Sequence, residues 1–276
     1  MSMELKILQD IKNNWKETSP MPLLFIGHGS PLNAIENNQY HRSWKELGKK
    51  LPRPVAILSI SAHWITHGTK VTMMQKPKTI HDFGGFPDEL YMQQYPAPGS
   101  IWLAEKTQLL TTNHPIEPDY EWGLDHGTWS VLLPMFPLAD IPVIQLSIDY
   151  HQPISYHYEL ATQLKKLREK GVLIIGSGNI VHNLQAMRME AGPYDWNLEF
   201  DQKIAHWIET GNDRAIIDFQ NLGSLARLAH PTYDHFLPLL YVLGLKDKKD
   251  RFEFFNEDYE FASMSMRSVV FNQTGS

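Results

Sequence analysis

The chain has 276 residues, of which 42% are hydrophobic and 20% are charged, a balance typical of a soluble globular protein. Lys and Arg number 25 against 31 Asp and Glu, and the resulting net charge of −6 argues against a nucleic-acid partner. The absence of cysteine excludes disulfides, thiolate metal ligands and cysteine nucleophiles. No run approaches the ~18 apolar residues of a membrane span. Residues 1–20 form a polar lead-in without the apolar core of a signal peptide, so we expect a cytoplasmic protein.

Short apolar runs alternate with segments of helical spacing along the chain. In chain order, the pattern predicts a strand at 23–26, a helix at 39–51, a strand at 55–62, a long ordered insertion at 65–100, helices at 101–112 and 130–136, a strand at 143–148, a helix at 154–170, a strand at 172–175, helices at 198–209 and 235–243, and strands within 252–271. This alternation predicts a single α/β domain over residues 1–276, with a mostly parallel central sheet and helices on both faces.

Histidines follow three of the predicted strands. His28 comes after the first strand, His63 ends the second, and His182 follows the strand at 172–175; a fourth, His235, begins a helix. In open α/β sheets, ligands bind at the carboxyl ends of the strands, and imidazole suits Zn(II) and Fe(II). The pattern therefore predicts a mononuclear metal site. The alternative is that each histidine is a separate polar group satisfied in its own loop, because no HExxH or HxH spacing is present.

Glycines accompany these histidines. Gly27 and Gly29 flank His28, where they allow a sharp turn or simply end a strand. The run Gly176-Ser177-Gly178 lacks the full GxGxxG pattern and the P-loop lysine, so a nucleotide site is disfavoured.

Six motifs occur in one order between about residues 22 and 266. They are Phe25-Ile26-Gly27-His28-Gly29-Ser30-Pro31, Ser61-Ala62-His63-Trp64, His81-Asp82-Phe83-Gly84-Gly85-Phe86-Pro87, Tyr95-Pro96-Ala97-Pro98-Gly99, Gly123-Leu124-Asp125-His126-Gly127-Thr128-Trp129 and Gly178-Asn179-Ile180-Val181-His182-Asn183-Leu184. Together they resemble the 4,5-DOPA extradiol dioxygenase family, which belongs to the class III extradiol ring-cleavage dioxygenases and is related to the catalytic subunit of protocatechuate 4,5-dioxygenase.

The resemblance implies a single α/β domain with a mononuclear non-haem metal, Fe(II) when active and Zn(II) in some isolated forms. It places metal-binding histidines at His28, His63, His182 and His235, and a catalytic residue that contacts substrate or assists proton transfer at His126. Protocatechuate 4,5-dioxygenase uses two histidines and a carboxylate, whereas these motifs offer histidine. The related enzyme uses a histidine in the region of His182 as base and not as ligand, so the resemblance leaves His182 as either a ligand or the catalytic base.

The expected partners are a small aromatic diol and O2. A catechol would be cleaved beside its diol to a muconic semialdehyde, with a neutral imidazole of His126 or His182 accepting a phenolic proton. Trp64, Phe83 and Trp129 are the aromatic residues expected to bind the ring, with core packing as the alternative for each. Two other functions stay open: a zinc-dependent hydrolase, and a non-catalytic binding protein of the same fold.

Overall fold

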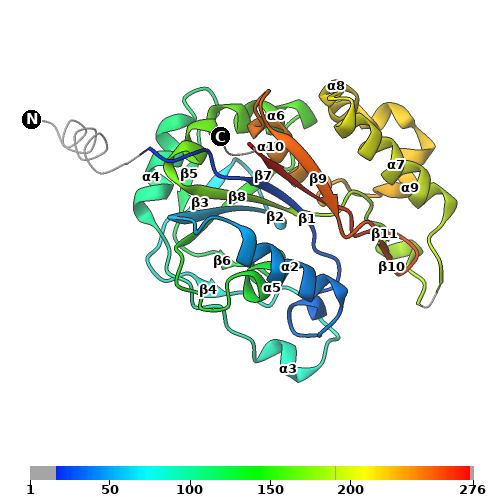
Figure 1. Cartoon of the computed structure of the whole chain (residues 1–276), viewed down its shortest axis with the longest axis horizontal. Coiled ribbons are helices and arrows are strands. Elements are labelled where there is room, and N and C mark those ends of the chain that lie inside the picture. The colour runs from blue at the N-terminus through cyan, green and yellow to red at the C-terminus, as the bar shows by residue number, and fades with distance from the viewer. Residues whose placement is uncertain (1–16, 190, 274–276) are drawn as a thin grey trace, which may run out of the picture.

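The centre of the molecule is an eight-stranded sheet (Figure 1). This computed structural model describes residues 17–189 and 191–273. From one edge to the other, the strands are β5 (Glu117–Asp119), β3 (Lys70–Thr72), β7 (Val143–Asp149), β2 (Ala56–Thr66), β8 (Val172–Gly178), β1 (Leu23–Gly27), β12 (Ser268–Asn272) and β9 (Arg251–Phe255). Most of the predicted 1–20 lead-in, residues 1–16, lies outside the described residues.

The four central strands, β7, β2, β8 and β1, run parallel. At one edge, β12 pairs antiparallel with β1, and β9 pairs antiparallel with β12. At the other edge, β3 is antiparallel to β7 and parallel to β5. The prediction of a mostly parallel sheet is confirmed, and the antiparallel pairs lie outside its centre.

Helices cover both faces of this sheet, as the sequence predicted (Figure 1). Successive side chains of a strand point to opposite faces, so Leu24 and Ile26 of β1 pack in one core while Leu23 and Phe25 pack in the other. The first core includes residues of α2 (Gln39–Lys50) and α5 (His126–Met135). The second includes residues of α4 (Ile101–Leu110), α6 (Ile154–Gln163), α7 (Asp195–Glu209), α8 (Asp213–Ile217), α9 (Ser224–Ala229) and α10 (Leu237–Leu245).

Local chemistry moves some predicted boundaries. Helix α5 begins at His126 rather than at residue 130, because the side chain of Asp125 accepts a hydrogen bond from the Thr128 amide and caps the helix. The helix predicted over 154–170 is α-helical only to Gln163; it continues as a 3-10 helix, Lys165–Lys170, which ends at left-handed Gly171.

The insertion predicted at 65–100 has secondary structure of its own. It contains β3, β4 (Lys78–Thr79) and the short helix α3 (Asp88–Tyr91), and β4 pairs with β6 (Gly123–Leu124). Near the other end of the chain, β10 (Tyr259–Glu260) and β11 (Met264–Ser265) form a hairpin. Within the described ranges, no helix is long and apolar enough to cross a membrane. The cytoplasmic location stays a prediction.

Candidate active site

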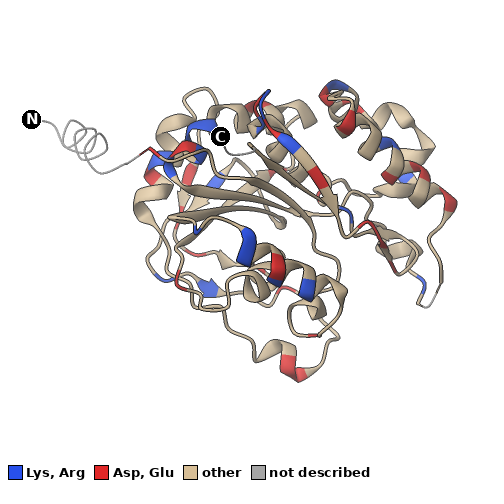
Figure 2. Ribbon diagram, viewed as in Figure 1, with Lys and Arg blue, Asp and Glu red and all other residues tan. Residues whose placement is uncertain are grey.

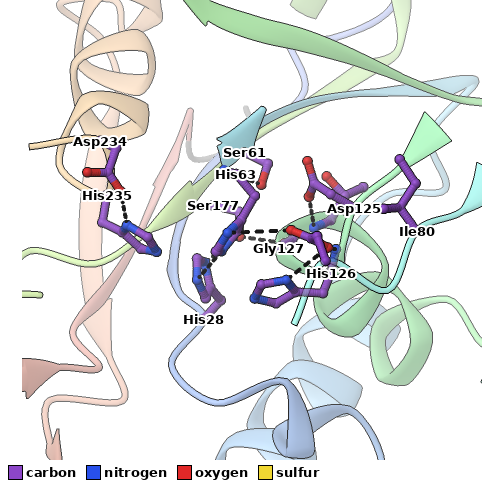
Figure 3. Close-up of polar contacts among 12 residues, drawn as sticks. His28, Ser61, His63, Ile80, Asp125, His126, Gly127, Ser177, Asp234 and His235 are labelled. Atoms are coloured by element: carbon purple, nitrogen blue, oxygen red, sulfur yellow. Dashed lines mark hydrogen bonds and ion pairs between the residues drawn. The ribbon is translucent and has the colours of Figure 1, made fainter. Parts of the chain in front are cut away.

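Five histidines from separate parts of the chain line one cavity. His28 follows β1, His63 lies near the end of β2, His126 begins α5, His182 follows β8, and His235 precedes α10. Figure 3 shows four of these rings, those of His28, His63, His126 and His235, facing the same space. Because β1, β8 and β2 are neighbouring parallel strands, their carboxyl ends bring His28, His182 and His63 together.

The tautomer of His28 follows from its hydrogen bonds. Ser177 Oγ donates to the Gly127 carbonyl at 2.5 Å, so its single proton is committed. The contact between Ser177 Oγ and His28 Nδ1 at 3.0 Å must then have Nδ1–H as the donor. His28 Nε2 therefore carries a lone pair, and it lies 3.1 Å from Nε2 of His63.

Asp82 lies beside two of the imidazoles. Its Oδ1 accepts a hydrogen bond from the His126 amide at 2.9 Å and lies 3.0 Å from His126 Nδ1, while Oδ2 lies 3.6 Å from His63 Nδ1. Burial raises the pKa of this carboxyl, but the contacts with His126 and the nearby His63 outweigh burial and lower the pKa to about 2. Asp82 is therefore ionised, and it favours the tautomers of His63 and His126 that leave Nε2 unprotonated.

His235 has a carboxylate partner of its own. Its Nδ1 lies 2.5 Å from Oδ2 of Asp234, and its ring stacks on that of His182 with centroids 3.5 Å apart and planes inclined by only 3°. Burial, reinforced by His182, His126 and His230, holds the pKa of His235 well below its usual value. Burial also lowers the pKa of His182, to about 4. Both rings are therefore neutral near pH 7.

Two glycines allow the close approach of these segments. Gly29 has a φ of 57°, and a Cβ there would lie 2.5 Å from Met266 Sδ, so the turn after His28 requires glycine. At Gly178, a Cβ would overlap the His235 carbonyl oxygen, which accepts a hydrogen bond from the Asn179 amide at 2.9 Å. The glycine-serine-glycine run of β8 thus holds His28 through Ser177 and makes room for the backbone of His235.

The cavity has a volume of about 640 Å³ and a mainly apolar wall. His28, His126 and His235 are at most 6% exposed at its inner end. Phe83 lies in the wall, with its ring edge-on to that of His126 at a centroid distance of 5.5 Å. A flat aromatic ring fits such a space.

Two of the aromatic residues expected to bind substrate lie outside the lining of this cavity. Trp64 follows His63 in β2 and points to the opposite face. There its ring stacks on that of Trp122, with ring centroids 5.6 Å apart. Trp129 is fully buried, and its Nε1 donates to the Ile80 carbonyl at 2.8 Å. Trp129 therefore supports the loop that carries Asp82 and Phe83.

The cluster has the chemistry of a metal site. Nitrogen atoms of His28, His63 and His126 lie within 4.8 Å of one another. Two nitrogens each bound at about 2.1 Å to one ion would lie about 3 Å apart, which is the separation of the Nε2 atoms of His28 and His63, 3.1 Å. Imidazole nitrogens are the donors that Fe(II) and Zn(II) accept.

Sequence reasoning missed the residues that hold the imidazoles and those that form the cavity mouth. Asp82 and Asp234 stand next to histidines in the sequence, a signal for carboxylate–histidine pairs, and Ser177 lies in the glycine run. No sequence signal places Met187 or Phe261 at the cavity, because both are brought there by long-range packing.

Comparisons with known proteins show the family of this chain. Residues 20–272 match the family described as the catalytic LigB subunit of aromatic ring-opening dioxygenase. The chain is 44% identical to a 4,5-DOPA dioxygenase extradiol of Escherichia coli K12 over 94% of this chain and 97% of that protein. It is 36% identical to a protein of the same name from Beta vulgaris over 95% and 99% of the two chains. The crystal structure of an uncharacterized Escherichia coli K12 protein, 40% identical, superposes with a TM-score of 0.79 over 91% of this chain and 100% of that chain. The chain therefore belongs to the LigB family of aromatic ring-opening dioxygenases and is an extradiol dioxygenase, an oxidoreductase.

Proposed function

We propose that this enzyme cleaves a catechol beside its diol, inserting both atoms of O2 to give a muconic semialdehyde. The observation that carries the proposal is the cluster of imidazoles at the inner end of an apolar cavity. We propose Fe(II) as the ion of the active enzyme. Zn(II) accepts the same nitrogen donors, and we expect it in some preparations of the isolated protein. A bound Fe(II) ion supplies Lewis acidity toward the diol and the electrons that activate O2.

The arrangement of the rings favours His28, His63 and His235 as the ligands. Their centroids form a nearly equilateral triangle, with sides of 5.0, 5.2 and 4.9 Å. Three imidazoles around one ion, each bound through Nε2 at about 2.1 Å, give centroid separations of about 5 Å. His126 lies 3.8 Å from His63 and 5.8 Å from His28, which is less regular, although its nitrogen belongs to the group within 4.8 Å.

His182 fits the role of catalytic base better than that of ligand. An imidazole binds metal in the plane of its ring, and the planes of His182 and His235 are parallel with centroids 3.5 Å apart. The two stacked rings would therefore not both hold the same ion, and His235 is the one that we assign to the metal. A neutral His182, with a pKa lowered by burial to about 4, is able to accept a phenolic proton and return it during ring opening.

His126 and Phe83 position the substrate in this proposal. The edge-on contact between their rings places an apolar surface beside the imidazole cluster. His126 is held by Asp82 and would donate a hydrogen bond to, or accept one from, a diol oxygen.

Oxygen uptake by anaerobically Fe(II)-reconstituted protein tests the reaction, with catechol, caffeate and L-DOPA as substrates. We expect one O2 consumed per diol and the absorbance of a yellow semialdehyde. Iron-loaded protein that consumes no O2 with any diol would overturn the proposal in favour of a zinc hydrolase or a binding protein.

Single variants test the assignment of the histidines. We expect His235→Gln to lose metal, and His182→Gln and His126→Gln to retain it with lower turnover. For His182→Gln, turnover falls by about 10²–10⁴, as loss of a proton-transfer group does. If His126→Gln loses metal and His235→Gln retains it, His126 is the ligand and His235 is the residue that positions the substrate.

A further inference from the structure

One loop forms a continuous part of the cavity wall. Residues 82–87, which we call the wall loop, all line the cavity. At its inner end, Asp82 contacts the imidazole of His126. At its outer end the wall loop enters α3, whose acidic first turn is exposed at the edge of the molecule (Figure 2). The wall loop therefore runs along the cavity from the imidazole cluster to the surface.

The wall loop carries two aromatic rings that are fixed by their neighbours. The rings of Phe83 and Phe86 pack edge-on to each other, with centroids 5.3 Å apart, and the ring of Phe83 also lies 5.1 Å from that of Tyr91 in α3. Both phenylalanines are partly buried against the hydrophobic core. Gly84 and Gly85, between them, are exposed. The wall between the two rings is therefore bare backbone.

The conformation of the chain explains glycine at position 85 but not at position 84. Gly85 has a φ of 79°, in the left-handed region that favours glycine. The φ of Gly84 lies outside this region, and a Cβ added there would meet no atom within 4 Å. By contrast, a Cβ at Gly123 or Gly178 would overlap a backbone oxygen. Neither backbone strain nor packing of the chain against itself therefore requires glycine at position 84.

We propose that Gly84 is a specificity-determining residue, whose missing side chain leaves room in the cavity for a substituent on the catechol ring. This inference rests on the proposed function. A diol held at the imidazoles places its ring beside Phe83, and Gly84 is the next residue outward along the wall loop. A larger side chain at position 84 would take the space of the substituent, and overfilling a packed space is unfavourable. An unsubstituted catechol ends short of this space.

The test compares kcat/KM of Fe(II)-loaded wild type and Gly84→Val for catechol and 4-tert-butylcatechol. Both diols are uncharged and differ only in the substituent. We expect the wild type to use the two diols within about tenfold of each other, and Gly84→Val to lower the tert-butyl-to-catechol ratio by at least about tenfold, as a few carbon atoms in a binding pocket can do. A smaller fall in the ratio, or a stronger preference of the wild type for catechol, overturns the proposal.

Gly192→Val is the matched control. Among the glycines of residues 17–189 and 191–273, only Gly84 and Gly192 combine a φ outside the left-handed region with free space around an added Cβ. Gly192 lies outside the cavity lining. We expect Gly192→Val to keep the wild-type ratio. An equal fall in both variants would contradict the role of Gly84.

A change in the shape of the wall loop is the competing explanation, because Asp82 is only two residues away. Urea unfolding and metal content of Gly84→Ala address it. We expect the urea midpoint and the metal content to be no lower than those of the wild type, since alanine at a compatible position restricts the unfolded chain. A lower midpoint or a loss of metal would mean that glycine maintains the loop, and would overturn the assignment. If the wild type cleaves neither diol, the proposed function fails separately, and anaerobic dissociation constants of the two diols give the same ratio.

Discussion

At the scale of single residues, one carboxylate holds two imidazoles. Asp82 accepts a hydrogen bond from the His126 amide and lies close to Nδ1 of both His126 and His63. Its side chain is only 19% exposed, so water competes weakly for these contacts. Such carboxylates fix the ring orientation and the tautomer of a metal-site histidine, and removing one typically costs 10–100-fold in affinity or activity.

Replacing Asp82 with asparagine tests this role. We expect Asp82→Asn to lower turnover or metal affinity by about 10–100-fold, because the amide keeps the shape but loses the charge and one acceptor atom. Metal content and oxygen uptake measured on the same sample separate the two effects. Asp88→Asn, in the exposed first turn of α3, is the control. Activity of Asp82→Asn within twofold of the wild type would contradict the role.

At the scale of elements, a buried ion pair anchors the hairpin that borders the cavity. Asp201 of α7 is fully buried and accepts hydrogen bonds from Tyr259 at 3.0 Å, Ser265 at 2.6 Å and Arg267 at 2.8 Å. These partners lie within and just beyond β10 and β11. The hairpin that carries Phe261 and Met264 is thus hydrogen-bonded to α7.

Removing this carboxylate should cost stability. We expect Asp201→Ala to lower the free energy of unfolding by about 3–5 kcal/mol, because it leaves the Arg267 guanidinium buried without its main partner. Urea unfolding measures the change. Asp140→Ala serves for comparison, since it removes an ion pair with Arg53 in which both side chains are well exposed, and should cost less than about 1 kcal/mol. Similar losses in both variants would refute the role of Asp201.

At the scale of the whole molecule, buried histidines make folding sensitive to acid. His157 of α6 is fully buried against Tyr241 of α10, with Nδ1 3.0 Å from the hydroxyl. Burial lowers the pKa of His157 to about 4. Because the unfolded chain binds this proton near pH 6.5, stability is complete above about pH 6.5 and falls as the pH drops from there toward 4.

The contribution of His157 can be isolated by substitution. Between about pH 7.5 and pH 5, we expect the wild type to lose about 2 kcal/mol more unfolding free energy than His157→Phe loses. Urea unfolding of metal-free protein at several pH values gives this difference. His206→Phe is the control, since the side chain of His206 is 67% exposed in the folded state. Parallel stability curves for wild type and His157→Phe would disprove the linkage.

The sequence predicted the features that depend on local pattern. Strands at 23–26, 55–62, 143–148 and 172–175 appear in the structure with boundaries moved by a few residues, and the histidines predicted after three of them, His28, His63 and His182, share one cavity. Successive side chains of a strand point to opposite faces of the sheet, so His63 and Trp64 of β2 could not both face the site that the sequence predicts for them. The sequence alone could not predict contacts between distant segments, such as those of Arg188 with Phe261 and of Asp82 with His126.

The pairing of β1 has a consequence for how the protein is made. The strand that leads to His28 lies between β8 and β12, and Leu23 is opposite both Ile174 and Phe271. A chain emerging from the ribosome therefore holds β1 without one of its neighbours until β12 has been synthesised. Contacts so distant in sequence form slowly. The central sheet closes around β1 only after β12 has been made, and until then the unpaired edge of that apolar strand is open to chaperones and to other chains.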